Sequence, residues 1–360
     1  MRIDKNTSER LSALRFPLII GVVFIHAFSP CVEFPNAVVG LSTQGYLSDL
    51  IQSIVSQGFS RIAVPLFFLI SGYLYFLGFS WSLENFKMKV ASRYKTLMLP
   101  FLFWNILTLI LIALGQILPV TKDYFSNDSA QIASFSIYEY VNAIFGLTRA
   151  PISYQFWFIR DLMLLFLLTP IIYSIARIQT IFLPIIIFLL WFINYWPITI
   201  PSVTAFTFFY AGAYFVYSKI SLFWLDRYGV GILILYLLVL VADTFSKGYE
   251  VNQYVHNMGL ILGMGSALYT SKFMVKIKSL KKVLLAISGS SFFVFAVHEP
   301  MLTIIKKVVY RAVEPTTAVI FLLLYLTIPV LVITSALLMY MALRNVMPRS
   351  LRVISGKRGV

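Results

Sequence analysis

Charged residues are scarce in this 360-residue chain, and cysteine is almost absent. Only 12% of the residues are Asp, Glu, Lys or Arg, whereas 59% are hydrophobic. Soluble domains carry about 25% charged residues because their surfaces face water, so this composition excludes an ordinary soluble protein. The single cysteine, Cys31, excludes an intrachain disulfide and a cysteine-based zinc site.

The sequence also lacks the motifs of several large enzyme classes. It contains no P-loop, no GxSxG, HExxH or GxGxxG segment, and no metal-ligand spacing of Cys and His, so we expect no metal. Any chemistry must therefore use His, Arg, Glu and Ser. That set suits acyl transfer, because His can deprotonate a hydroxyl or carry an acyl group and Arg can stabilise an oxyanion or bind a phosphate.

Long apolar runs fill most of the chain. They are about 20 residues long, which is the length a helix needs to cross roughly 30 Å of hydrocarbon. We predict an all-α fold, a polytopic transmembrane bundle of about ten spans that forms a single integral-membrane domain over residues 1–360, with no soluble domain. The predicted spans lie near residues 14–30, 54–79, 97–118, 153–175, 180–197, 203–218, 228–244, 254–270, 283–305 and 316–343. The first is interpreted as a retained helix, since no small-residue cleavage site follows it.

Basic residues outnumber acidic ones by 29 to 14, and their distribution predicts the orientation. Most of them fall in loops on one side, near residues 2–15, 87–95, 219–227, 272–282 and 344–358. The positive-inside rule makes that side cytoplasmic, together with both termini. Because no polar domain carries the charge, we expect no nucleic-acid partner. Lys306, Lys307 and Arg311 fall outside, so either that span boundary is wrong or these cations hold an anionic acceptor.

The first span, in RLSALRFPLIIGVVFIHAFSP, carries Arg15 and His26 eleven positions apart. Eleven helical steps end about 20° past three full turns, so both side chains share a face, about 16 Å apart along the axis. Ionisable residues inside a membrane are functional candidates by default. The alternative stays open that Arg15 extends to the interface and His26 makes an interhelical hydrogen bond.

A second cluster lies at the start of the fourth span, in QFWFIRDLMLLFLLTP. Arg160 and Asp161 are charged residues in an otherwise apolar helix, and Trp157 lies three positions before Arg160, on the same face. A cation–π contact between Trp157 and Arg160 is one expectation. A functional role and a structural ion pair are both compatible with this pattern.

A third cluster, SGSSFFVFAVHEPML, falls near the end of the ninth span. Ser291 and His298 are seven positions apart and share a face, whereas Glu299 points about 100° away from His298. Pro300 lacks a backbone donor and is expected to kink or loosen the helix. The pattern indicates a polar cavity, and the alternative is a helix end that reaches interfacial water.

Other polar residues in the spans have simpler interpretations. Arg61 is expected near the outer end of the second span, and the small residues Ser71 and Gly72 are expected to allow close helix packing. His256, in QYVHNMG, is interpreted as a solvated histidine at an outer loop.

Taken in order, these segments resemble the integral-membrane acyltransferase-3 family, which includes bacterial O-antigen and other surface-polysaccharide O-acetylases. The matching segments are Arg15-x10-His26, VPLFFLISGYL, KVASRYKTLMLP, QFWFIRDL, FTFFYAGAYF and SGSSFFVFAVHEPML. The chain departs from the family at Phe295–Ala296, where Tyr–Leu is frequent. No hydrolase-like domain follows the tenth span, as it does in longer members.

The resemblance implies a membrane O-acyltransferase of the bacterial inner membrane. It would use acetyl-CoA from the cytoplasm as acyl donor and pass the acyl group to a hydroxyl of a surface polysaccharide or its lipid-linked precursor. His26 and Arg15 would be catalytic, with Arg15 at the phosphates of the donor and His26 at its thioester. Substrate would be bound by Arg61, Trp157, Arg160, Ser291, His298 and Glu299.

A transporter or flippase for a lipid-linked or anionic substrate is the main alternative, because buried charges and broken helices suit it equally well. The two classes differ in their product, since a transferase leaves an ester and free CoA. The sequence leaves open the acceptor sugar, the acyl chain, the oligomeric state, and whether the acyl group passes through an acyl-enzyme.

Overall fold

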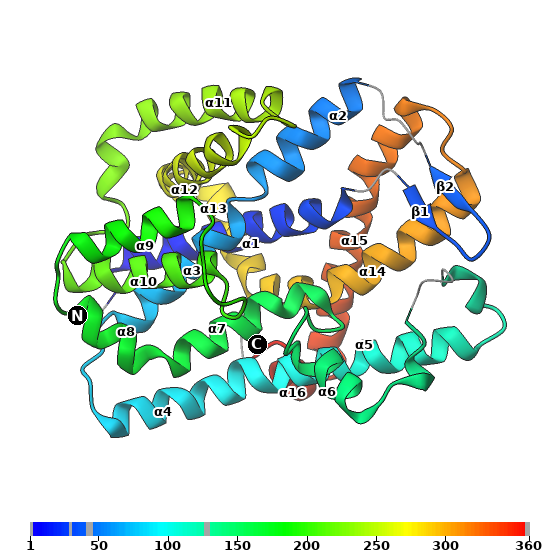
Figure 1. Ribbon diagram of the computed structural model, residues 1–360, viewed down its shortest axis with the longest axis horizontal. Helices are drawn as coiled ribbons and strands as arrows, with labels where there is room; N and C mark the ends of the chain where they lie inside the picture. Colours follow the sequence, from blue (N-terminus) through cyan, green and yellow to red (C-terminus); the bar gives the residue numbers. More distant parts are fainter. Residues whose placement is uncertain (1–2, 29–30, 41–45, 126–129, 357–360) are drawn as a thin grey trace. The chain divides into compact units, whose positions relative to one another are not determined.

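The computed structural model describes residues 3–28, 31–40, 46–125 and 130–356. Within these ranges the chain is almost entirely helical (Figure 1). The α-helices are α1 (Lys5–Ala27), α2 (Tyr46–Gln52), α3 (Ala63–Phe76), α4 (Leu83–Arg93), α5 (Leu99–Ile117), α6 (Ile137–Phe145), α7 (Trp157–Leu167), α8 (Thr169–Ala176), α9 (Phe182–Phe192), α10 (Val203–Tyr217), α11 (Gly229–Phe245), α12 (Asn252–Lys276), α13 (Lys278–Ile287), α14 (Ser291–Val313), α15 (Ala318–Val346) and α16 (Pro348–Ile354). The described strands, β1 (Cys31–Glu33) and β2 (Val38–Gly40), form one antiparallel hairpin.

Short 3-10 and π-helical segments complete the described structure. They are η1 (Ser53–Phe59), η2 (Tyr94–Met98), η3 (Lys122–Tyr124), η4 (Ile132–Ser134), η5 (Tyr154–Phe156), η6 (Trp224–Tyr228) and η7 (Ser288–Ser290). The residues between the third and fourth predicted spans include three of these helical elements, η3, η4 and α6.

The fold class predicted from composition is confirmed: the protein is a helical polytopic membrane bundle. In the described part of the chain, seven helical segments are long and apolar enough to span a membrane. A further pair, Tyr154–Leu167 and Thr169–Ala176, is bent by 65° and makes eight if it counts as one span. The remaining apolar helices, α9 and α10, have 11 and 15 residues. The count of ten spans therefore stays a prediction, because these two helices are short.

Two expectations about helix limits are wrong. The helix that carries the ninth predicted span does not end near residue 305: α14 continues to Val313 and carries Lys306, Lys307 and Arg311 in its last turns. His256 does not lie in a loop. It is in α12, and its Nδ1 is 2.9 Å from Oδ2 of Asp243, a carboxylate on α11 that has only a 7% exposed side chain.

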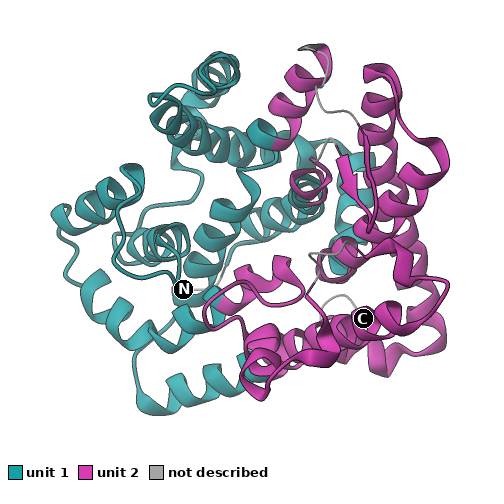
Figure 2. Ribbon diagram, turned by 45° about the vertical axis from the view of Figure 1, so that its right-hand side comes forward, with its two compact units in different colours: residues 1–22, 57–94, 161–291 teal, residues 23–56, 95–160, 292–360 magenta. Residues whose placement is uncertain are grey.

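The chain divides into two compact units, coloured separately in Figure 2. The first comprises residues 1–22, 57–94 and 161–291, and the second comprises residues 23–56, 95–160 and 292–360. The division falls inside α1, so Arg15 belongs to the first unit and His26 to the second.

Close packing of α3 against α10 organises the first unit. Gly72 on α3 lies so near that a Cβ there would be 2.1 Å from the carbonyl oxygen of Phe209, and a Cβ on Gly212 would be 2.3 Å from that of Leu69. Only glycine allows two backbones to approach in this way. The packing role predicted for Gly72 is confirmed.

A buried arginine stabilises the start of α1 in the same unit. Arg10 is only 3% exposed. Its guanidinium makes two hydrogen bonds to the carboxylate of Asp226, at 2.6 and 3.0 Å, and another at 2.9 Å to the hydroxyl of Ser271. A buried charge of this kind is tolerated because its donors are paired.

In the second unit, an apolar core lies around α14 and α15. Its largest fully or nearly fully buried side chains are Tyr310, Phe321 and Tyr325. The hydroxyl of Tyr325 lies 2.7 Å from that of Ser56, so its polar end is satisfied inside the core. The hairpin packs on this core through Val32, which is 7% exposed.

Candidate active site

His26, Tyr154 and Glu299 meet in the second unit. His26 is in the last turn of α1, Tyr154 begins η5, and Glu299 is on α14. Nδ1 of His26 is 3.0 Å from the hydroxyl of Tyr154, and that hydroxyl also bonds to Oε1 of Glu299. The rings of His26 and Tyr154 meet edge to face at 73°, with their centroids 4.9 Å apart. A histidine, a phenol and a carboxylate thus form one continuous chain of hydrogen bonds.

The chemistry of these groups assigns the protons in that chain. When Glu299 is ionised, its carboxylate can only accept, so Tyr154 donates its one proton to Glu299. The oxygen of Tyr154 then accepts from Nδ1–H of His26. The tautomer that follows has its lone pair on Nε2, the nitrogen that can take a proton from a hydroxyl.

His298 lies beside this chain of hydrogen bonds. Its ring centroid is 5.4 Å from that of His26, and the side chain is fully buried. Nδ1 is 2.6 Å from the carbonyl oxygen of Phe295, which can only accept, so Nδ1 carries the proton. Within the described chain, Nε2 has no hydrogen-bond partner. Because α14 continues for fifteen residues past His298, the alternative of a helix end in interfacial water is wrong.

The carboxylate of Glu299 is fixed from its own helix as well. Its Oε2 accepts a 2.8 Å hydrogen bond from Thr303, one turn further along α14. Two turns beyond Glu299, Nζ of Lys306 reaches the carbonyl oxygen of Ala27, 3.5 Å away, at the end of α1. The contact of Lys306 with Ala27 holds the end of α1 against α14, which places His26 beside Glu299.

Pro300 also helps to position the site. Without an N–H it cannot bond to the carbonyl oxygen of Ala296, four residues before it. That carbonyl accepts instead from Nε2 of Gln155, at 3.1 Å, and Gln155 is 2% exposed. The sequence predicted that Pro300 would loosen the helix, and the carbonyl group that it leaves open binds the segment that carries Tyr154.

A second set of contacts fixes that segment from the other side. Ser153 donates from its backbone N–H to Asn105 on α5, at 3.1 Å, and its hydroxyl lies 2.7 Å from that of Thr108. Arg160 donates from Nη1 to the carbonyl oxygens of Gly146 and Arg149, at 2.6 and 3.0 Å. Arg160 thus ties the start of α7 to the loop after α6.

Trp157 and Asp161 both belong to α7 but have different surroundings. Trp157 is the first residue of α7 and is half-buried. Asp161 is fully buried, and its Oδ2 accepts a 2.8 Å hydrogen bond from the backbone N–H of Ser202, at the start of α10. An anion at a helix N-terminus is favourable, so Asp161 has a structural role in the first unit.

The other predicted site residues belong to the first unit. Arg15 is exposed on α1, and Arg61 is exposed with Nε 3.0 Å from Oε1 of Gln57. Ser291 begins α14 and is 7% exposed, and its hydroxyl has no partner among the described residues. Of the predicted residues, the structure brings His26, His298 and Glu299 together.

Tyr154 is the site residue that the sequence did not reveal. A tyrosine at the start of an apolar span is the usual signature of an aromatic belt at the membrane interface. Tyr154 is 39% exposed, which agrees with that pattern. Only the hydrogen bonds of its hydroxyl distinguish it from an ordinary aromatic residue at the membrane interface.

The site contains no metal-ligand cluster. No group of three His, Cys, Asp or Glu that could hold a metal ion occurs in the described ranges. Its polar groups are an imidazole, a phenol and a carboxylate joined by hydrogen bonds.

Comparisons with known proteins show which family the chain resembles. Residues 9–340 match the family described as an acyltransferase domain. A succinoglycan biosynthesis protein, ExoH, of Rhizobium meliloti (strain 1021) is 25% identical over 365 residues, which cover 99% of this chain and 94% of the relative. No solved structure matches the chain. With its helical membrane fold and a family match over nearly the whole sequence, the chain belongs to the integral-membrane acyltransferase-3 family.

Proposed function

We propose that the protein is an O-acetyltransferase of the bacterial inner membrane. It transfers the acetyl group of cytoplasmic acetyl-CoA to a hydroxyl of a surface polysaccharide or of its lipid-linked precursor. The observation that carries this proposal is the chain of hydrogen bonds from His26 through Tyr154 to Glu299. The succinoglycan relative supports a polysaccharide acceptor.

In the proposed reaction His26 is the general base. Nε2 takes the proton of the acceptor hydroxyl as its oxygen attacks the thioester carbonyl, so that an O–C bond forms and the C–S bond breaks. The proton then passes from Nε2 to the departing thiolate, which leaves as free CoA. Tyr154 and Glu299 hold the imidazole and stabilise the charge it gains during the transfer.

Nε2 of His298 is proposed to accept a hydrogen bond from the substrate. It is a buried acceptor near His26, and a buried polar atom gains from a partner by about 1–3 kcal/mol. A hydroxyl of the acceptor sugar has the donor that this nitrogen needs.

The donor side of the proposal uses arginine. Arg15 lies eleven residues before His26 on α1, on the cytoplasmic side in the predicted orientation. A guanidinium is suited to the phosphates of CoA because it is always charged and can form two parallel hydrogen bonds. Arg61 and Arg160 are proposed to add positive charge on the path of the substrates.

The test compares surface polysaccharide from a strain without the gene with that from strains that carry wild-type protein or His26→Ala. Mass spectrometry should show acetyl esters, removable with mild base, in the wild-type strain and their loss with His26→Ala. His256→Gln is the matched control, since His256 pairs with Asp243 in the first unit, and it should keep the esters. Immunoblots establish that each variant is present in the membrane.

Ester formation that persists in His26→Ala would overturn the assignment of the base. Unmodified polysaccharide in the wild-type strain, with the protein present, would favour the transporter or flippase.

A further inference from the structure

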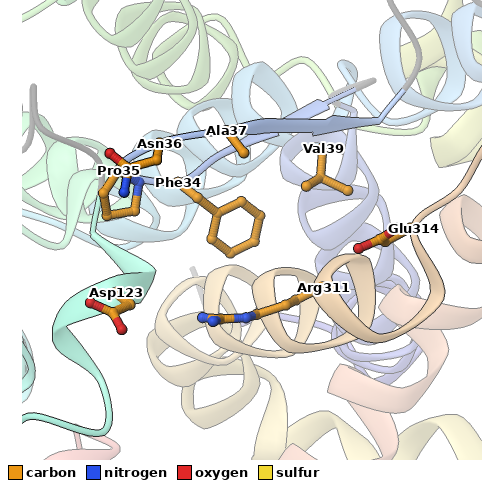
Figure 3. A pocket seen from close by; sticks show the side chains of 8 residues that line it. All are labelled: Phe34, Pro35, Asn36, Ala37, Val39, Asp123, Arg311 and Glu314. Atoms are coloured by element: carbon orange, nitrogen blue, oxygen red, sulfur yellow. The ribbon is translucent and has the colours of Figure 1, made fainter.

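A pocket lies in the second unit at the far end of α14 from the histidines. Its volume is about 350 Å³. Three separate segments line it: the turn of the β1–β2 hairpin, the η3 turn, and the C-terminal end of α14 (Figure 3). Pockets for small ligands occupy about 300–1,000 Å³, so this one has room for a small ring and not for a larger cofactor.

The hairpin wall of the pocket is fixed by the fold. The strands pair Cys31 with Gly40 and Glu33 with Val38, and the backbone N–H of Phe34 donates to the carbonyl oxygen of Ala37 at 2.8 Å. Phe34 also packs against the apolar core of the unit. The phenyl ring that faces the pocket is therefore held in place.

The other two walls are joined by cation–aromatic contacts. Cζ of Arg311 lies 4.9 Å from the centroid of the Tyr124 ring, and that ring is 6.1 Å from Phe34. Nζ of Lys307 donates to the carbonyl oxygen of Tyr124. Such contacts contribute about 0.5–1 kcal/mol each at exposed sites, and with the hydrogen bond from Lys307 they favour the position of η3 against α14.

Donors and acceptors alternate around the apolar ring of Phe34. Arg311 can only donate, Asp123 and Glu314 can only accept, and the amide of Asn36 can do both. Figure 3 shows Arg311 between the two carboxylates, with Phe34 above it. This arrangement suits a sugar ring, whose C–H face packs on an aromatic ring and whose hydroxyls both donate and accept. A phosphate is disfavoured, because two carboxylates lining the pocket would repel it.

The backbone of Glu314 is a further sign of function. Its φ is +44°, and its N–H bonds to the carbonyl oxygen of Tyr310 at 3.0 Å, which closes the C-terminus of α14. A positive φ at the end of a helix favours glycine, and a residue with a Cβ lowers the stability by about 1–2 kcal/mol there. A glutamate at this position places a carboxylate in the pocket at the expense of stability, and strained residues of this kind concentrate at functional sites.

From these observations we infer that the pocket binds a saccharide unit of the acceptor glycan. The inference rests on the proposed function, whose acceptor is a polysaccharide. Arg311 is twelve residues beyond Glu299 on α14, or about 18 Å along the helix. The bound unit is therefore another sugar of the same chain and not the one that is acetylated. The pocket selects the acceptor and leaves the chemistry to the histidine end of α14.

The experiment uses the full-length protein in nanodiscs, acetyl-CoA, and oligosaccharides cut from the surface polysaccharide and freed of esters. Asp123→Asn, Arg311→Gln and Glu314→Gln each remove one charge from the pocket. Each should raise KM for the oligosaccharide about ten-fold, the loss expected for a hydrogen bond to a charged group, with a smaller change in kcat. Asp49→Asn and Arg349→Gln are the controls, since both residues are exposed in the same unit but do not line the pocket.

Binding of the oligosaccharide, measured by isothermal titration calorimetry on variants with the wild-type melting temperature, separates the two proposals. Wild-type affinity and KM in all three pocket variants would overturn the pocket and leave the transferase standing. Binding that needs the pocket residues, in a protein that transfers no acetyl group, would overturn the proposed function and leave the pocket standing. Weaker binding in the controls as well would overturn the pocket, because the effect would then not be local.

Discussion

At the scale of single residues, the hydroxyl of Tyr154 sets the tautomer of His26 in the proposed mechanism and so decides which nitrogen would act as the base. It connects the imidazole to the carboxylate of Glu299, so neither group needs to reach the other directly. A phenol is suited to this position because one oxygen can donate and accept at the same time.

Replacing Tyr154 by Phe tests this role. The ring stays, so packing is preserved, but Nδ1 of His26 loses the acceptor that fixes its tautomer. We expect kcat to fall about one hundred-fold, at the lower end of the contribution of general acid–base catalysis. Acetyl transfer by the purified protein, measured as release of free CoA, checks this prediction.

Tyr138→Phe is the control for Tyr154→Phe, because Tyr138 is 57% exposed on α6 and takes no part in the hydrogen bonds of the site. It should have the wild-type kcat. A Tyr154→Phe protein as active as Tyr138→Phe would show that the phenol does not position the histidine.

At the scale of elements, α14 and the α3–α10 pair have different tasks. α14 carries His298 and Glu299 in its first half and Arg311 near its end, so one helix carries residues of both the proposed chemistry and the proposed recognition. The α3–α10 pair stabilises the first unit by close packing, since Gly72 and Gly212 allow the two backbones to approach each other.

Gly72→Ala should destabilise the protein. Its Cβ would meet the backbone of Phe209, which cannot rotate away as a side chain can, so the helices must separate. Overpacking costs about 1–3 kcal/mol, and we expect the upper end because backbone is involved. The fall in melting temperature of the purified protein in detergent measures it.

Gly231→Ala on α11 is the matched control, because no atom lies within 4 Å of a Cβ placed there. It should be as stable as the wild type or slightly more so, since alanine favours a helix over glycine by about 1 kcal/mol. Equal melting temperatures for the two variants would mean that α3 and α10 do not pack this closely in the membrane.

At the scale of the whole molecule, the orientation in the membrane determines which substrate reaches which end of the site. The loop charges predict that both termini are cytoplasmic and that the segment after α5 is outside. The predicted orientation would put Arg15 on the side of the proposed acyl-CoA donor and the hairpin pocket on the side of the proposed polysaccharide acceptor.

Single cysteines introduced into a Cys31→Ser protein test the orientation. Lys122→Cys should react with a membrane-impermeant maleimide in intact cells, because η3 is predicted to be outside. Lys87→Cys and Arg349→Cys should react only after lysis. Labelling of Arg349→Cys in intact cells would contradict an even number of spans with both termini inside.

The sequence by itself determined the class of the protein. Its apolar runs require helices, because a helix satisfies every backbone hydrogen bond within one segment of the membrane. The position of Gly72 in an apolar run predicted close packing, and the motifs from Arg15 to Glu299 predicted the family. Helix limits were less predictable. Lys306, Lys307 and Arg311 lie inside α14, and His256 lies inside α12, because groups from other elements contact these polar side chains and allow them within a helix.

Only the tertiary structure decided how the site is assembled. His26, Tyr154 and Glu299 are separated by more than a hundred residues at each step, and no periodicity connects positions on different helices. The sequence predicted that His298 and Glu299 cannot pair along one helix, and a third helix supplies the phenol that joins Glu299 to His26. The hydrogen bond from Gln155 to Ala296 is also decided by the tertiary structure. The sequence determines that Pro300 leaves the carbonyl of Ala296 without its helical donor, and the packing determines that Gln155 supplies another.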